Sequence, residues 1–264
     1  MIEIISAIVG AIVAAVANHF VEKRKQRRQL EIQKEKFETQ TLESAKSIHS
    51  DLSENFGWKA KKLISKMTVL NKQGDARFLR SWKGIQITTG ETRSRLPGYF
   101  WSSPAGSLKS PPVLSLPNEF PKKVDLQIEK IGNERCEFYA DIAGSLTDYD
   151  PPLDYDIHWE QKGTTLLNSE AVKEAYKDDH FKYDYFSYYV GPPPIEKLIL
   201  EVNFPFDVTA EFYSAVFDGR TEYQVDKEFQ RTRTGLDKLP SGARFTIEEP
   251  LIGLTYLIYW IFKD

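Results

Sequence analysis

The feature that most restricts the fold of this 264-residue chain is a change of sequence texture after Gly74. From there on, short runs of β-branched and aromatic residues alternate with polar ones, separated by Gly, Pro, Asn and Asp. Alternation with a period of two places successive side chains on opposite faces of a strand, and strands at intervals of about ten residues are typical of a β-sandwich. The candidate strands are 78–88, 113–116, 124–131, 136–142, 155–160, 183–190, 197–204, 209–217, 221–229, 244–248 and 254–262.

Two pairs of similar segments indicate a second arrangement, two tandem sandwiches. Residues 126–142 resemble 200–216, and residues 153–159 resemble 254–260. Strand alternation by itself produces such patterns. We therefore predict one larger sandwich over 74–264, with two domains dividing near residue 191 as the alternative. The only predicted helix within this region is 169–177, which Ser169 can cap.

The first 21 residues predict a transmembrane anchor. Residues 4–17 are apolar or small throughout, and the wider run 2–21 approaches the roughly 20 residues that a helix needs to span a bilayer core. The basic residues Lys23, Arg24, Lys25, Arg27 and Arg28 follow it directly. They place the N-terminus outside and the remaining chain in the cytoplasm, as a single-pass protein of the inner (cytoplasmic) membrane. The alternatives are a cleaved signal peptide, which the missing charged n-region disfavours, and a buried or interfacial helix.

One face of the predicted anchor carries small and polar residues at every fourth position: Ser6, Gly10, Ala14 and Asn18. Small residues at this spacing let helices approach closely, and Ser or Asn can hydrogen-bond across the contact. We interpret the face as a site of helix association, which predicts a homo-oligomer. The alternative is the ordinary composition of a transmembrane helix.

Residues 22–73 predict a helical stalk between the anchor and the β-rich region. This segment contains no proline, and a stripe with helical spacing runs through Ala45, Ile48, Leu52, Phe56, Ala60, Leu63, Met67 and Leu70. Its first part is polar and solvated, and its second part is amphipathic. The second part forms either a coiled coil between protomers or a helix packed on the β domain of its own chain. Since the stripe lacks a strict heptad, packing on the β domain is favoured.

The charge is unevenly distributed along the chain. Residues 22–72 hold thirteen Lys and Arg against seven Asp and Glu, a net of +6, and Glu3 adds −1. The whole chain carries −3, so residues 73–264 carry −3 − 6 + 1 = −8. Nucleic acid binding requires clustered positive charge, so a nucleic acid partner is disfavoured for this acidic part.

Basic residues within the acidic part form the best candidate for an anion site. Arg231 and Arg233 would share one face of a strand, and Arg220 lies nearby in the sequence. Two guanidinium groups on one face can hold a phosphate or carboxylate through paired hydrogen bonds. The alternative is cross-strand pairing with the many acidic residues, which applies equally to the neighbouring Lys227, Lys238 and Arg244.

The sequence predicts no catalytic residues, no metal site and no cofactor. The single cysteine, Cys136, excludes a disulfide framework, and the acidic run 148–156 lacks the spacing of an EF-hand. His158 has no nucleophile in a turn beside it, and no phosphate-binding loop is present. The aromatic run 176–189 favours strand packing over a stacking surface for a base or peptide. We therefore expect a non-enzymatic protein.

The arrangement of short anchor, basic collar, polar helix and β-rich domain resembles small membrane-anchored proteins of bacterial conflict and antiphage systems. The ending Glu249-Pro250-Leu251-Ile252-Gly253-x-x-Tyr256-x-Ile258-x-Trp260 resembles the closing strand of β domains in such systems. This resemblance implies a sensor domain that gates oligomerisation or membrane disruption. We expect a membrane-anchored sensor or effector whose cytoplasmic β domain binds a small molecule or protein and controls anchor assembly. The alternatives are a constitutive tether for a cytosolic partner and a nucleotide-binding module.

Overall fold

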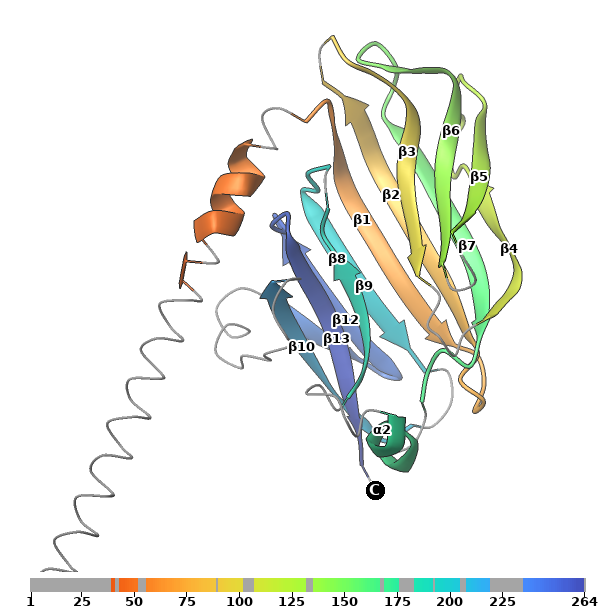
Figure 1. The fold of residues 1–264 in the computed structure, drawn as a ribbon, viewed down its shortest axis with the longest axis vertical. Helices are drawn as coiled ribbons and strands as arrows, with labels where there is room; N and C mark the ends of the chain where they lie inside the picture. The colour runs from red at the N-terminus through yellow and green to blue at the C-terminus, as the bar shows by residue number, and fades with distance from the viewer. Residues whose placement is uncertain are drawn as a thin grey trace, which may run out of the picture. The chain divides into compact units, whose positions relative to one another are not determined.

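The computed structural model describes residues 39–40, 43–51, 56–88, 90–101, 107–131, 135–166, 169–175, 183–191, 193–204, 208–218 and 235–263 (Figure 1). The chain divides into two compact units, Met1–Ser47 and Ile48–Asp264. The described residues before Trp58 are helical at 39–40 and 43–51. The β-rich fold lies entirely within the second unit.

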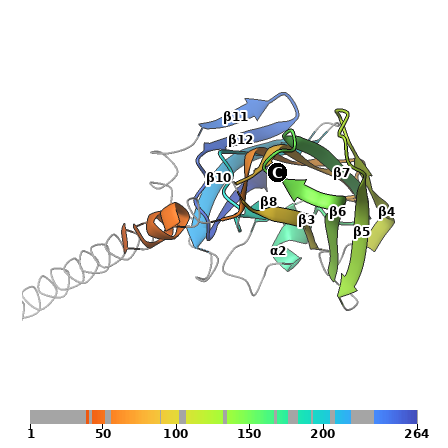
Figure 2. The same cartoon turned by 90° about the horizontal axis from the view of Figure 1, so that it is seen from above.

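Seven strands form one mixed sheet in the order β11-β12-β9-β1-β2-β7-β4. Their bounds are β11 (Gly235–Leu239), β12 (Gly242–Glu248), β9 (Lys197–Asn203), β1 (Trp58–Val69), β2 (Ala76–Ile87), β7 (Leu153–Lys162) and β4 (Ser107–Ser115). All the described pairings in this sheet are antiparallel except that of β1 with β9. Figure 2 shows β11 and β12 on one side of the β-rich unit and β4 on the opposite side.

Two three-stranded antiparallel sheets complete the described strands. One has the order β10-β13-β8, with β10 (Ala210–Asp218), β13 (Leu254–Phe262) and β8 (Asp184–Tyr189). The other has the order β3-β6-β5, with β3 (Thr92–Trp101), β6 (Arg135–Thr147) and β5 (Val124–Ile131). The short helix α2 (Ser169–Ala175) follows β7.

Both small sheets pack on the same face of the large sheet. Phe78 of β2 and Trp159 of β7 are neighbours in register, and their rings stack with centroids 5.2 Å apart. Phe186 of β8 lies 6.2 Å from Phe78, and Phe138 of β6 contacts Trp159 edge-on at 5.7 Å. Aromatic rings bury large apolar areas and favour these tilted and edge-on geometries. The hydrophobic core therefore lies between the large sheet and the two small ones.

Strand β1 shows that the predicted helical stalk is wrong. Residues 58–69 form a strand with Leu63, Ser65, Met67 and Val69 on its buried face, a period of two. The helical stripe crossed this segment because Ala60, Leu63 and Met67 also fit steps of three and four. The strand is stabilised by pairing with β2 and with the distant β9, a contact that a local pattern does not reveal. The coiled coil that this stalk was predicted to form is therefore wrong as well.

The prediction of a single-pass membrane protein is also corrected. In the part of the chain that the structure describes, no helix is long and apolar enough to cross a bilayer. The nine helical residues 43–51 would extend only about 14 Å at 1.5 Å per residue, against a bilayer core of about 30 Å. We therefore do not retain the predicted anchoring and inner-membrane localisation. Residues 1–21, including Ser6, Gly10, Ala14 and Asn18, lie outside the described residues.

The mostly β character of residues 74–264 is confirmed, and most predicted strands correspond to observed ones. Strand β13 is the central strand of its sheet and is buried from Leu254 to Trp260. Strands β3 and β11 were not predicted, and segment 221–229 lies outside the described residues. The similarity of residues 126–142 to 200–216 is not a structural repeat, because β5 and β6 are paired neighbours whereas β9 and β10 belong to different sheets.

Candidate functional site

A cavity of about 470 Å³ opens between strand β10 and the β11–β12 hairpin, and we call it the edge pocket. It combines segments from the end of β9, the start of β10 and the hairpin turn. The lining residues are Phe204, Val208, Thr209, Ala210, Phe212, Lys238, Leu239, Pro240, Ser241 and Gly242.

The hairpin wall of the edge pocket is fixed by backbone contacts. Leu239 and Gly242 pair across a two-residue turn, and the Phe204 amide donates a hydrogen bond to the Ser241 carbonyl at 2.6 Å. Position 242 has no room for a side chain, because a Cβ there would lie 1.9 Å from the Val202 carbonyl oxygen. Glycine therefore lets the hairpin lie directly against β9.

The back of the edge pocket is aromatic. Phe204 is 1% exposed, and its ring centroid lies 5.8 Å from that of Phe212 and 5.4 Å from that of Trp260. Phe212 and Trp260 are themselves 6.4 Å apart. Rings locked by three mutual contacts hold their positions, so this wall is preformed and does not depend on a ligand.

Strand β10 has backbone N–H and C=O groups that face away from its sheet, beside the edge pocket. β10 is the outermost described strand of its sheet, and the Thr209 carbonyl accepts a hydrogen bond from the Lys263 amide at 2.9 Å. Hydrogen-bonded positions alternate along an antiparallel pair. The N–H and C=O groups of Ala210 and Phe212 therefore point away from β13, toward the edge.

The edge pocket has a positive rim. Lys238 is exposed, and within the described ranges no carboxylate forms an ion pair with it. The nearby Glu211 is engaged by Lys263 at 2.8 Å and by the Tyr213 hydroxyl at 2.6 Å. The hydrogen bond from Lys263 is the main cause that lowers the pKa of Glu211. Lys238 adds a smaller Coulombic contribution to the same shift without an ion pair between the two described side chains, and its exposed amine stays accessible to an anion.

The structure describes only part of the basic cluster that was predicted to hold an anion. Arg220, Arg231 and Arg233 lie outside the described residues, between the end of β10 and the start of β11. Arg244, from the same basic cluster, donates to Glu201 Oε2 at 2.9 and 2.7 Å, and Lys66 lies 2.7 Å from Glu201 Oε1. Burial would raise the pKa of Glu201, but the hydrogen bonds from Lys66 and Arg244 outweigh it and lower that pKa. The pairing interpretation therefore holds for Arg244.

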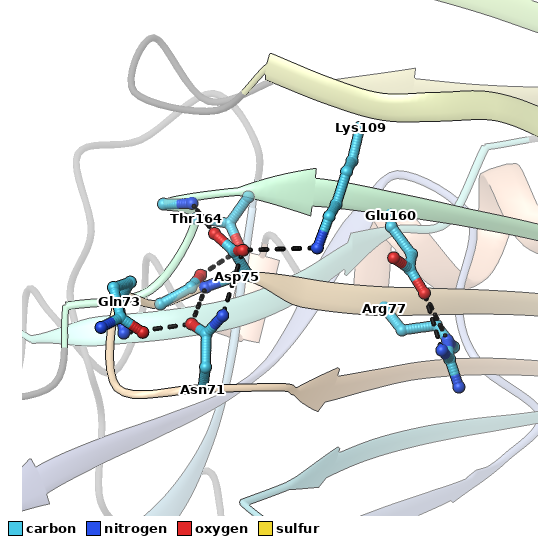
Figure 3. Close-up of polar contacts among 9 residues, drawn as sticks. Asn71, Gln73, Asp75, Arg77, Lys109, Glu160 and Thr164 are labelled. Carbon is cyan, nitrogen blue, oxygen red and sulfur yellow. Dashed lines mark hydrogen bonds and ion pairs between the residues drawn. The ribbon is translucent and has the colours of Figure 1, made fainter.

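A network of polar contacts ties the β1–β2 turn to its surroundings (Figure 3). Asn71 Oδ1 accepts hydrogen bonds from the amides of Gln73 and Asp75 at 3.0 and 3.1 Å, and Asn71 Nδ2 donates to Asp75 Oδ2 at 3.1 Å. Asp75 also accepts from the Gly163 amide at 3.2 Å, and Lys109 lies 3.7 Å away. The hydrogen bond from Asn71 is the main cause that lowers the pKa of Asp75. The network is structural, because its donors and acceptors satisfy one another.

The acidic run 148–156 is divided among separate partners. Asp150 pairs with Lys122, Asp156 accepts from Ser81 and Lys83, Asp154 accepts from the Gly84 amide, and Asp148 accepts from the Gly90 amide. Among the described residues, no group of three or more His, Cys, Asp or Glu side chains is arranged to hold a metal ion.

The described part of the aromatic run contributes to packing. Tyr183 and Tyr185 pack against a buried cluster of Ala215, Leu257 and Tyr259. The Tyr259 ring stacks with that of Tyr183 at 5.3 Å and with that of Tyr213 at 5.2 Å. Residues 176–182 lie outside the described residues. The packing interpretation therefore applies to the strand that follows them.

Sequence reasoning identified only Lys238 among the edge-pocket residues. The Leu-Pro-Ser-Gly sequence at 239–242 is a usable hairpin signal, because proline and glycine favour tight turns. The other wall, 204–212, is distant in the sequence and is brought close only by the pairing of β9 with β12. No local pattern could have joined the two walls.

Comparison with known proteins shows similarity only to solved structures. No family model and no curated protein matches the chain. Yeast LTA4 hydrolase in complex with bestatin is similar at a TM-score of 0.40 and 10% identity, covering 79% of this chain and 29% of that one. Native yeast LTA4 hydrolase is similar at 0.39 and 8% identity, with 79% and 30% covered. The chain thus spans less than a third of these neighbours, and similarity at this level does not define a function.

Proposed function

We propose that the β domain is a non-catalytic binding module that holds a small molecule or a segment of a partner protein in the edge pocket. The observation that supports this proposal is the preformed cavity of about 470 Å³ with an aromatic back wall and a cationic rim. Ligand sites are typically concave, of about 300–1,000 Å³, with a few polar groups that orient the ligand.

The groups at the mouth of the edge pocket favour binding over catalysis. Thr209 and Ser241 offer hydroxyls, and Lys238 offers an ammonium group, all on exposed residues. None of the ten described residues that line the cavity is His, Cys, Asp or Glu. Hydroxyl and ammonium groups hold a polar ligand through hydrogen bonds, and a binding role needs nothing beyond them.

The proposal is tested with the anionic aromatic probe 1-anilinonaphthalene-8-sulfonate and the full chain. We expect saturable probe fluorescence in the wild type and its loss in Ala210→Trp, which fills the cavity. The control variant Gln86→Trp adds the same ring at an exposed position of β2 and should bind the probe as the wild type does. Circular dichroism establishes that both variants are folded. Equal probe fluorescence in the wild type and Ala210→Trp would overturn the proposal.

A further inference from the structure

We infer that the occupant of the edge pocket is an extended peptide that pairs with the edge of β10 that no described strand covers, with an apolar side chain in the cavity and a carboxylate beside Lys238. This inference rests on the proposed binding function and specifies its ligand class. Three observations support it: the outward backbone groups of β10, the shape of the cavity and the position of the cation.

The edge of β10 is suited to strand addition. Its outward N–H and C=O groups recur at the half-buried Ala210 and Phe212, which is the spacing that an added strand requires, whereas the next such position, Ser214, is buried. Natural edge strands are usually protected by proline, lysine or bulges. Strand β4, at the edge of the large sheet, has Pro111, Pro112 and shifts in register. Strand β10 has neither proline nor lysine within its nine residues, and its edge is not protected in these ways.

The cavity beside that edge can take a side chain of the added strand. Alternate side chains of an extended peptide point to the same side. A peptide paired with β10 would direct one apolar side chain toward Phe212 and Leu239, which belong to the two opposite walls of the edge pocket. Main-chain hydrogen bonds then provide affinity, and the pocket provides side-chain preference.

The charge at the rim selects an acidic peptide. Lys238 is the charged side chain that lines the cavity, and Glu211 is already engaged by Lys263 at 2.8 Å. A carboxylate of the peptide would complete an ion pair with Lys238 and accept hydrogen bonds from Thr209 or Ser241. The carboxylate belongs either to an Asp or Glu side chain or to the C-terminus of the peptide, and the test separates these two sources.

The test uses the full chain and a positional-scanning library of N-acetylated peptides of nine residues, the length of β10. One half of the library ends in an amide and the other half in a free acid. We expect one position to prefer apolar residues and a neighbouring position to prefer Asp or Glu. If the free-acid half binds more tightly than the amide half and no position prefers Asp or Glu, the C-terminus is the anion, which also supports the inference.

Two matched changes examine the contacts separately. Lys238→Glu should reverse the acidic preference toward Lys and Arg, whereas Lys162→Glu, an exposed lysine at the end of β7, should leave it unchanged. Methylation of every second peptide amide, in the set that faces β10, should weaken binding by about tenfold or more, and methylation of the intervening amides should not.

The outcomes distinguish the inference from the proposed function. Absence of library binding, equal effects of methylation at all amides, or an acidic preference that survives Lys238→Glu would overturn the inference. The probe experiment with Ala210→Trp would still stand in each of these cases. Failure of that probe experiment would overturn the binding function itself, and the inference with it.

Discussion

Asp75 and Asp184 hold the two ends of one short segment, residues 163–166. Asp75 Oδ1 accepts a hydrogen bond from the Gly163 amide at 3.2 Å, and Asp184 Oδ2 accepts one from the Leu166 amide at 2.9 Å. Asp75 follows β1 in the large sheet, and Asp184 begins β8 in a small sheet. The two carboxylates therefore link the layers of the sandwich through the loop that leaves β7.

The buried Asp184 should make stability depend on pH. Burial raises its pKa to about 7 from 3.8, so the folded state binds this proton more tightly than the unfolded state. Its contribution is complete below about pH 4 and is lost as the pH rises through about 7. We expect the free energy of unfolding to fall by about 2–3 kcal/mol between pH 5 and pH 8 from this group.

The measurement is urea denaturation of the wild type and Asp184→Asn at both pH values. The asparagine does not titrate, so the variant should show a smaller difference between the two pH values. The pKa of Asp75 is lowered instead, and its contribution is lost only in more acidic solution. An unchanged pH difference in Asp184→Asn would contradict the assignment.

Gly74→Ala should be strongly destabilising. Gly74 has a φ of +80°, and a Cβ there would lie 2.0 Å from the Thr165 carbonyl oxygen. Strain from the positive φ and the backbone clash together should cost about 2–4 kcal/mol. Gly90 is the matched control, because its φ is +83° and a Cβ there would have no atom within 4 Å. Thermal unfolding should show a clearly smaller loss for Gly90→Ala, of about 1 kcal/mol.

Glu201→Gln should destabilise the large sheet. The Glu201 carboxylate is 9% exposed and holds both Lys66 and Arg244, so its removal leaves two cations without their shared anion. The two cations are themselves partly exposed, which limits the expected loss to about 1–3 kcal/mol. The comparison is Glu248→Gln, whose pair with Lys197 lies at the surface and should contribute less than about 1 kcal/mol. Similar unfolding midpoints in urea for the two variants would contradict the special role of Glu201.

Phe138→Ala should loosen the sheet formed by β3, β6 and β5. Phe138 is 2% exposed and contacts Trp159 of the large sheet at 5.7 Å. Loss of this ring should cost about 3–5 kcal/mol, because the cavity left behind cannot close fully. Ile128→Ala on the neighbouring β5 removes a side chain that is 40% exposed and should cost about 1 kcal/mol or less. Hydrogen exchange of the β6 amides should rise in Phe138→Ala and stay near the wild-type rate in Ile128→Ala.

Local alternation was enough to predict the strands that have one polar and one apolar face or a long apolar run. The predictions for 124–131 and 254–262 agree with β5 and β13. Alternation works here because each side chain is directed by its own backbone, whatever the strand pairs with. It was not enough for 58–69, whose residues fit a helical stripe as well as a strand.

Pairing between segments distant in the sequence determines the two features that the local pattern did not predict, strand β1 and the edge pocket. Strand β1 is held between β2, a near neighbour in the sequence, and β9, which lies more than a hundred residues away. The edge pocket arises in the same way, since its two walls are joined by the pairing of β9 with β12 and by the hydrogen bond from the Phe204 amide to the Ser241 carbonyl. Which strands become neighbours, and where a cavity forms, depends on the free energy of burying whole sheet faces together. The local sequence of a strand does not reveal which distant strand it will pair with.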